Sequence, residues 1–237
     1  MDRGWGGLEN LSLIPGNVGA SPMQNIGAYG VEIKDVFWDL QALHMESGRI
    51  ATFTIGDCHF GYRESVFKTS FRNQYVILDV TYCLRKKPVL HTSYGAIRQE
   101  LEAGGARQPG IREVADAVIR IRQSKLPDPA VIGNAGSFFK NPTITAPQFK
   151  ALQQRYPAII GYPAPGDMVK LAAGWLIETA GWKGYREGDA GVHPQQALVL
   201  VNYGNAGGAE IYSLSEKILQ SVRSTFGVEL EREVNII

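Results

Sequence analysis

The chain contains 237 residues, of which 44% are hydrophobic and 20% charged, and its formal net charge is +1. This composition excludes a disordered chain and suits one large folded domain or two small ones. The small net charge gives no global reason to expect nucleic acid or an anionic membrane as a partner, so we expect a small metabolite.

The two cysteines, Cys58 and Cys83, are too few for a disulfide framework and lack the spacing of metal ligands. We expect both thiols in the core, no metal, and a reducing compartment. No apolar run approaches the ~18 residues of a membrane span, and no leader pattern opens the chain. The expected location is therefore the cytoplasm.

The first informative stretch runs from Gly7 to Gly30 and reads GLENLSLIPGNVGASPMQNIGAYG. Backbone N–H groups in such a glycine-rich loop can bind a phosphate or lie against a flat ring. The stretch matches neither the GxGxxG fingerprint nor a P-loop. A ligand-binding loop and an ordinary packed loop are therefore equally compatible with it.

Residues 31–84 are rich in strand-forming side chains, above all in the run Tyr75–Tyr82. We predict strands here, with a hairpin turn at Ser47-Gly48-Arg49. Arg63 lies between the predicted strands, in the sequence FGYRES. It is either a surface charge or a fixed anion clamp, and its neighbours, a Gly-Tyr pair and two polar residues, favour the clamp.

The second half of the chain is predicted to be mixed. Residues 110–123 have the apolar spacing of an amphipathic helix, and the two prolines of SKLPDP then end it and indicate a domain boundary. Together with the strands before them, these features predict an α+β fold. The further elements that we predict are helices after Thr145, over Asp167–Ala180 and over Ser213–Phe226, and strands over Gln195–Asn202 and Val228–Ile237, the last with Glu229, Glu231 and Glu233 on one face.

The segment Gly133–Pro142 reads GNAGSFFKNP and places one hydroxyl, on Ser137, between glycines, aromatics and a cation. Glycine at positions 133 and 136 allows a positive φ, so we expect a tight turn. A serine hydroxyl can donate a proton where neighbours such as Lys140 and Asn141 stabilise the oxygen left behind. The alternative is an ordinary turn whose two phenylalanines enter the core.

Six segments, in this order, resemble one family. They are the glycine-rich stretch, FGYRES, SKLPDP, GNAGSFFKNP, KLAAGWLIE and HPQQALVLVN. The chain resembles the carboxy-terminal two thirds of the UDP-N-acetylenolpyruvoylglucosamine reductases, the flavoenzymes of peptidoglycan precursor synthesis. The resemblance implies an oxidoreductase that uses FAD and NADPH to reduce the enolpyruvyl ether of a UDP-sugar, giving UDP-N-acetylmuramate.

The resemblance also implies roles for single residues. Ser137 would donate the proton at C2, Arg63 would pair the substrate carboxylate, and Glu233 would complete the site, although the tail here reads REVN where the family reads close to PEVR. The mobile tyrosine that covers substrate in one subtype would be Tyr94. Expected flavin contacts are Gly16, Gly19, Ser21, Gln24, Asn25, Ala28 and Tyr29, and the expected contacts with the nucleotide sugar are Tyr94, Lys125, Lys140, Asn141, Lys183 and Gln196.

By the same resemblance, residues 1–122 form the FAD-binding domain and residues 123–226 a smaller substrate-binding domain. Residues 227–237 would be a strand that returns to the first domain. Family members have a further segment before the position of residue 1, so we expect an N-terminally truncated chain, whose missing segment is encoded upstream or as a separate fragment. The alternatives are a UDP-sugar-binding module without flavin and an FAD-dependent oxidoreductase with another substrate.

Overall fold

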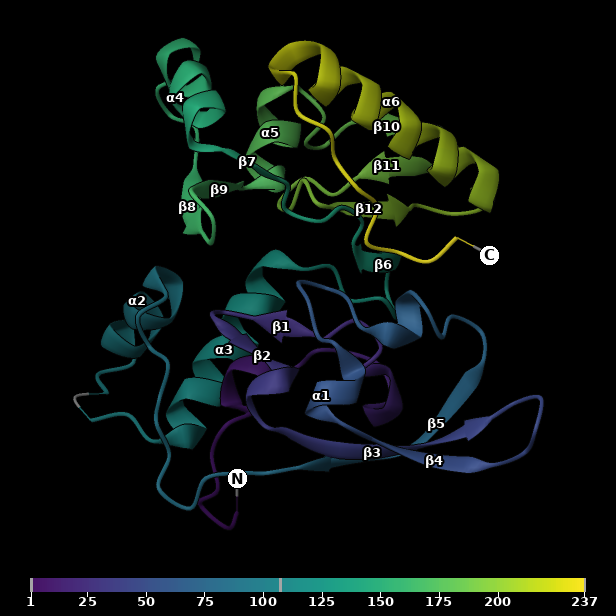
Figure 1. The fold of residues 1–237 in the computed structure, drawn as a ribbon. Coiled ribbons are helices and arrows are strands. Elements are labelled where there is room, and N and C mark those ends of the chain that lie inside the picture. Colours follow the sequence, from purple (N-terminus) through teal and green to yellow (C-terminus); the bar gives the residue numbers. More distant parts are fainter. Residues whose placement is uncertain (1, 107, 237) are drawn as a thin grey trace. The chain divides into compact units, whose positions relative to one another are not determined.

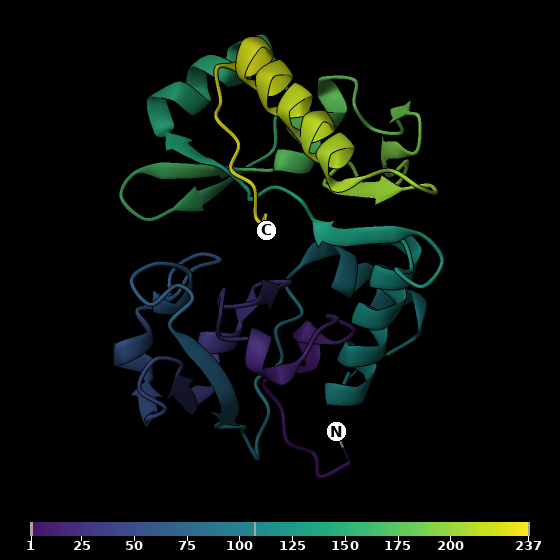
Figure 2. The same cartoon turned by 90° about the vertical axis from the view of Figure 1, so that its right-hand side faces the viewer.

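The structure is a computed structural model that describes residues 2–106 and 108–236. The chain divides into two compact units, Met1–Ser124 and Lys125–Ile237. Each unit combines helices with antiparallel sheet, so the mixed α and β content is confirmed (Figures 1 and 2). The functional names expected for the two regions stay predictions.

The first unit contains a three-stranded antiparallel sheet in the order β4-β3-β5 (Figure 1). The predicted strand Tyr75–Tyr82 is β5, and the predicted turn joins β3 to β4, with Gly48 at φ +66°. A core of aromatic and aliphatic side chains covers one face of the sheet, because inward and outward residues alternate along each strand. The strands are β3 (Phe37–His44), β4 (Ile50–Thr54) and β5 (Tyr75–Tyr82), and the core includes Leu40, Ala42, Phe53 and Phe67.

Two longer helices of the first unit pack against each other. The predicted helix over residues 110–123 is confirmed as α3 (Ile111–Lys125), whose Val114 and Val118 are fully buried. They meet Ile97 and Leu101 of α2 (Gly95–Ala103), a helix that the sequence analysis missed. The remaining elements are β1 (Gly27–Ala28), β2 (Val31–Glu32), α1 (Ile55–Cys58) and the 3-10 helices Glu9–Leu11, Val18–Ala20, Ile33–Asp35 and Val66–Lys68.

The expectation that both cysteines lie in the core is half wrong. Cys58 is fully buried, but Cys83 is exposed just after β5. Burial raises the pKa of the Cys58 thiol to about 12.

The second unit has two antiparallel sheets and three helices. One sheet has the order β10-β11-β12-β6 and the other the order β7-β9-β8. The strands are β6 (Gly133–Ser137), β7 (Thr143–Thr145), β8 (Gly161–Ala164), β9 (Met168–Leu171), β10 (Arg186–Glu187), β11 (Ala190–Val192) and β12 (Val199–Asn202), and the helices are α4 (Ala146–Arg155), α5 (Ala173–Thr179) and α6 (Gly208–Phe226).

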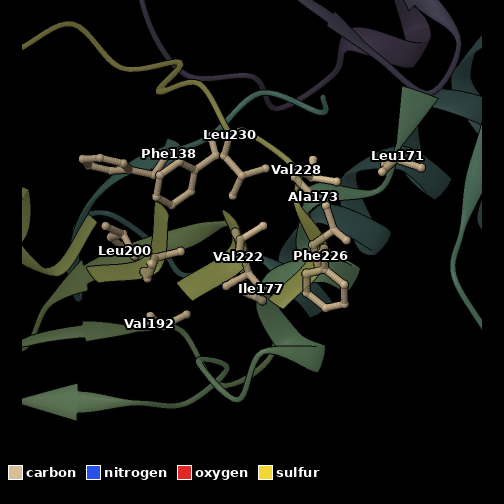
Figure 3. Packing of buried hydrophobic residues seen from close by; sticks show 14 of the residues in the cluster. Phe138, Leu171, Ala173, Ile177, Val192, Leu200, Val222, Phe226, Val228 and Leu230 are labelled. Atoms are coloured by element: carbon tan, nitrogen blue, oxygen red, sulfur yellow. The ribbon is translucent and has the colours of Figure 1, made fainter. Parts of the chain in front are cut away.

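One hydrophobic core joins these elements. Figure 3 shows Phe138, Leu200 and Val222 gathered with side chains of the tail, Val228 and Leu230. The predicted helix after Thr145 is confirmed, with the Thr145 hydroxyl accepting from the Gln148 N–H. Both phenylalanines of GNAGSFFKNP are buried in this core, as the alternative for that segment required.

Two predicted helices have wrong boundaries. Residues 168–171 form β9, the central strand of its sheet, because pairing with β7 and β8 overrides the helical spacing of their side chains. Helix α5 therefore begins only at Ala173. Helix α6 begins at Gly208, where the Glu210 carboxylate accepts from the Gly207 N–H at 2.7 Å, so the start predicted at Ser213 lies inside the helix. Its end at Gly227, with φ +68°, is as predicted.

Three further expectations need correction. The tight turn expected at Gly133–Pro142 begins as the edge strand β6, with a register shift opposite Val199 and Val201 and with Gly136 at φ +73°. The strand expected over Gln195–Asn202 starts only at Val199, since a turn from Gln196 precedes it. The tail over residues 228–236 forms a single bridge, Phe139 with Arg232, and no strand.

Candidate active site

Arg63 is a fixed cation of the first unit. Its guanidinium Nη2 donates to the Gly27 carbonyl oxygen at 2.5 Å, and its Nη1 lies 4.0 Å from Glu32 Oε1. The guanidinium also lies 5.1 Å from the centre of the Tyr62 ring. Only 17% of the side chain is exposed, so Arg63 is not a surface charge, and its role as an anion clamp stays a prediction.

Asn25 links this arginine's loop to the hairpin formed by β1 and β2. Its amide nitrogen donates to Glu32 Oε2 at 3.1 Å and to the Gly61 carbonyl at 2.9 Å, while its oxygen accepts from the Lys34 N–H. Asn25 is fully buried. Its side chain therefore stabilises the packing of the loop against the hairpin, and a flavin contact at this position stays a prediction.

A cavity of about 220 Å³ lies within the glycine-rich stretch of the first unit. The Ser21 hydroxyl at its wall donates to the Val18 carbonyl and lies 2.5 Å from the Tyr82 hydroxyl. Burial raises the pKa of Tyr82, so this phenol stays neutral. Of the predicted flavin contacts, Gly16 and Ser21 line the cavity, together with apolar side chains such as Leu11, Ile14, Ile26 and Ile33.

The other predicted flavin contacts are spread over the same stretch. Gln24 accepts from Lys68 Nζ at 3.4 Å, and Gly19 lies next to Ile77. Ala28 pairs with Val31 in the hairpin.

Tyr29 and Tyr94 form an edge-to-face pair with ring centroids 5.3 Å apart. Tyr94 is the N-cap residue of α2 and is 47% exposed. Burial raises the pKa of Tyr29, although the positive charge of Arg122 acts in the opposite direction, and burial lowers the pKa of Arg122. The fully buried Asn10 donates to the Tyr29 and His91 carbonyls and so ties the segment before Tyr94 to the glycine-rich stretch.

In the second unit, the backbones that carry Ser137 and Glu233 are joined. Ser137 ends β6, and the next residue, Phe138, accepts at its carbonyl from the Glu233 N–H at 2.9 Å. Arg232 anchors the same tail to α6 through the Ser215 hydroxyl at 2.8 Å and through the Glu216 carboxylate. The second unit thus brings two of the three predicted catalytic residues onto adjacent segments.

Lys140 and Asn141 follow directly and are both engaged. Lys140, 10% exposed, pairs with Glu231 Oε1 at 2.5 Å, and its N–H donates to the Glu231 carbonyl. Asn141 Oδ1 accepts from the Ala173 N–H at 2.9 Å, at the start of α5. Lys140 is therefore a buried ion-pair partner of Glu231 in this structure, and its contact with the nucleotide sugar stays a prediction.

The remaining predicted contacts of the second unit lie near its surface. Lys125 is exposed, and Lys183 pairs with Glu178 at 2.8 Å. Gln196 accepts at its side-chain oxygen from the Leu198 N–H. Burial lowers the pKa of His193.

Comparison with known proteins identifies the family. Over 236 residues the chain is 56% identical to the UDP-N-acetylenolpyruvoylglucosamine reductase of Pseudomonas syringae pv. syringae (strain B728a), an alignment that covers 100% of this chain and 69% of the relative. The chain belongs to this reductase family. The enzyme of Flavobacterium johnsoniae is 52% identical over 238 residues, covering 100% of this chain and 71% of the relative.

A family model agrees with this membership, and a solved structure is similar in fold. Residues 128–237 match the family described as UDP-N-acetylenolpyruvoylglucosamine reductase, C-terminal domain. The crystal structure of the Thermus caldophilus reductase is similar in fold, with a TM-score of 0.65 at 24% identity, over 99% of this chain and 65% of that one. The chain thus spans about two thirds of the length of these reductases.

The prediction of reductase family membership came from ordered motifs, but several residues that support the site were missed. Glu32 and Arg122 lie outside the six segments, and Asn10 and Gly27 lie in the glycine-rich stretch with no feature that separates them from its other residues. The roles of all four follow only from their contacts with residues elsewhere in the chain. The pairing of Gly27 with Glu32 could have been suggested by the short GAYG turn between them.

The described residues hold no group of three His, Cys, Asp or Glu side chains suited to a metal ion. In the same part of the chain, no helix has both the length and the apolar character needed to cross a bilayer.

Proposed function

We propose that this chain carries the FAD-dependent, NADPH-driven reduction of UDP-N-acetylenolpyruvoylglucosamine to UDP-N-acetylmuramate. The observation that carries the proposal is the 56% identity to a reductase of that name across the whole chain. The structure supports it with a fixed arginine in the first unit and with a serine and a carboxylate on adjacent segments of the second. FAD, NADPH and the UDP-sugar are the proposed small-molecule partners, and the cytoplasm is the proposed location.

The residues of the glycine-rich stretch fit part of a flavin. The cavity of about 220 Å³ has apolar walls next to the Ser21 and Tyr82 hydroxyls, which suits a flat ring with polar edges. At Gly16, with φ +112°, an added Cβ would meet nothing within 4 Å, so the backbone is open to a ligand. We propose that Gly16, Gly19, Ser21, Gln24, Asn25, Ala28 and Tyr29 contribute to holding FAD.

A bound FAD would supply one hydride equivalent, taken from NADPH, to C3 of the enolpyruvyl group. The chain's own residues have two remaining tasks. Arg63 pairs the substrate carboxylate and stabilises the negative charge that develops as C3 is reduced. Ser137 donates a proton to C2, which completes the lactyl ether, with Glu233 beside it in the site.

The nucleotide sugar needs cationic and amide groups. We propose that Lys125 and Lys183, both exposed, serve its diphosphate, and that Asn141, Gln196 and Tyr94 contact the sugar and its nucleotide. Lys140 is paired with Glu231 in this structure. We propose that its charge either stabilises the Ser137 oxygen during proton donation or contacts the nucleotide sugar after the ion pair with Glu231 opens.

The variant Ser137→Ala tests this proposal. Reduction of the flavin by NADPH should be unchanged, while reoxidation by the enolpyruvyl UDP-sugar should slow by about 10²- to 10⁴-fold, the usual contribution of a positioned general acid. Stopped-flow absorbance of the flavin separates the two half-reactions. The control is Ser224→Ala, an exposed serine of α6 in the same unit. Near-normal reoxidation in Ser137→Ala would remove Ser137 from the role of proton donor, and a wild-type chain that takes up no flavin would contradict the FAD proposal.

A further inference from the structure

The hairpin of β1 and β2 binds the Arg63 guanidinium through one hydrogen bond and one longer ion pair. Gly27 and Glu32 face each other across the hairpin as a paired position. Gly27 accepts from Nη2 at 2.5 Å, and Glu32 Oε1 lies 4.0 Å from Nη1. A single cross-strand pair thus hydrogen-bonds one terminal nitrogen of the guanidinium and places a carboxylate 4.0 Å from the other.

Gly27 has no space for a side chain. An added Cβ would lie 2.8 Å from Arg63 Nη1, 2.9 Å from Glu32 Cγ and 2.9 Å from the Val31 carbonyl oxygen. These distances are shorter than real Cβ contacts, so the arginine or the hairpin would have to move. Gly27 does not have a positive φ, and so the need for glycine comes from the close approach of Arg63 and the hairpin and not from backbone strain.

The loop that carries Arg63 is also held in place. Arg63 itself has φ +56°, in the left-handed region that few non-glycine residues adopt, and Gly61 bridges Glu64 around it. Asn25 bonds both Glu32 and the Gly61 carbonyl, which joins the hairpin and the loop into one hydrogen-bonded body.

We propose that Gly27 is a positioning residue for Arg63: its carbonyl oxygen and its missing side chain set the plane of the guanidinium for the carboxylate of the substrate. This inference rests on the proposed function of Arg63. A planar guanidinium binds a carboxylate best through two parallel N–H donors, so its orientation decides how much of that interaction is realised. An arginine side chain that is free to rotate would lose part of it to rotamer entropy.

The first test needs no ligand. In protein labelled with ¹⁵N-arginine, the signals of Arg63 can be assigned by their loss in Arg63→Lys. The wild-type guanidinium should show separate Nη signals, because the contacts with Gly27 and Glu32 restrict rotation about its Nε–Cζ bond. Gly27→Ala should merge them, whereas Gly56→Ala should not, since an added Cβ at Gly56 meets only Thr54 Oγ1 at 3.8 Å. Unchanged Arg63 signals in Gly27→Ala would overturn the inference whatever the chain's activity.

The second test measures binding by calorimetry, with UDP-N-acetylmuramate, which carries the carboxylate, and UDP-N-acetylglucosamine, which does not. Gly27→Ala should weaken the first about 10- to 100-fold, the range for a charge-assisted interaction, and leave the second unchanged. In an Arg63→Ala background, Gly27→Ala should have no further effect on either ligand. Weakening of both ligands, or an equal effect without Arg63, would show a general distortion and overturn the inference. Wild-type protein that binds the two nucleotides equally would instead count against the proposed role of Arg63.

Discussion

Replacement of Leu230 by alanine should weaken the packing of the tail against the core of the second unit. Leu230 is 8% exposed and belongs to the hydrophobic core, where it lies beside Phe138 in Figure 3. It is three residues before Glu233, and the tail on either side of it is fixed by Val228 and by the Lys140–Glu231 pair. Its packing therefore connects the stability of the unit to the position of a proposed catalytic residue.

The expected loss follows from the groups removed. Leucine to alanine deletes three carbons, worth about 0.8 kcal/mol each on burial, or about 2.4 kcal/mol. A cavity adds to this cost where the surroundings cannot collapse. Since the tail is a surface segment that can relax onto the gap, we expect the cavity part to be small and the total to be about 2–3 kcal/mol.

Urea unfolding followed by tryptophan fluorescence measures this loss. Trp175 and Trp182 both pack against the core of the second unit, so replacing Trp5 and Trp38 by phenylalanine limits the signal to that unit. The matched control is Ile236→Ala in the same tail, where the side chain is 50% exposed and the change should stay within about 0.5 kcal/mol. A loss below about 0.5 kcal/mol for Leu230→Ala would refute the packing of the tail.

Three further predictions concern single side chains. In native protein a thiol reagent should label exposed Cys83 quickly and buried Cys58 only slowly, and rapid labelling of both without urea would contradict the burial of Cys58. Asn141→Ala should lower the free energy of unfolding by about 1 kcal/mol, because the Ala173 N–H loses its acceptor. Asn141→Asp keeps an acceptor and should lower it less. Equal losses for the two variants in urea unfolding would argue against this hydrogen bond. Burial lowers the pKa of His193, so the unfolded chain binds the proton more readily and the free energy of unfolding should fall as the pH drops below about 6.5. In His193→Gln, the midpoint of urea unfolding should depend less on pH over this range, and an unchanged pH dependence would refute the prediction.

Elements whose ends are set by local chemistry could be predicted from the sequence. The helix at residues 110–123 has a regular apolar stripe, Thr145 caps the next helix, and Gly227 ends the last one. The strand Tyr75–Tyr82 was recognised by its β-branched and aromatic side chains. In each case the deciding interactions lie within a few residues of one another.

Elements that depend on distant partners could not be predicted in the same way. The residues of β9 have helical spacing, and only pairing on both sides with β7 and β8 makes them a strand. The edge strand β6 exists because β12, more than sixty residues later, supplies its partner. In the tail, the buried side chains of Val228 and Leu230 alternate with exposed glutamates, which is the side-chain pattern of a strand. The backbone of the tail nevertheless forms one bridge and no strand.

The same distinction applies to the site. Ser137 and Arg63 lie in two of the six segments and Glu233 in the tail, so the resemblance assigns them roles, and these roles stay predictions. Gly27 is one glycine among 27, and its contact with Arg63 joins positions 36 residues apart. The ion pair of Lys140 with Glu231 could not be predicted, because the two residues are 91 positions apart.

The proposed reaction is tested most directly by one turnover of the wild-type chain. Flavin bound to the protein should bleach on addition of NADPH and should regain its absorbance when UDP-N-acetylenolpyruvoylglucosamine is added without oxygen, with one UDP-N-acetylmuramate formed per flavin. A chain that binds FAD and is reduced, but whose flavin stays reduced with this substrate and yields no lactyl ether, would contradict the account.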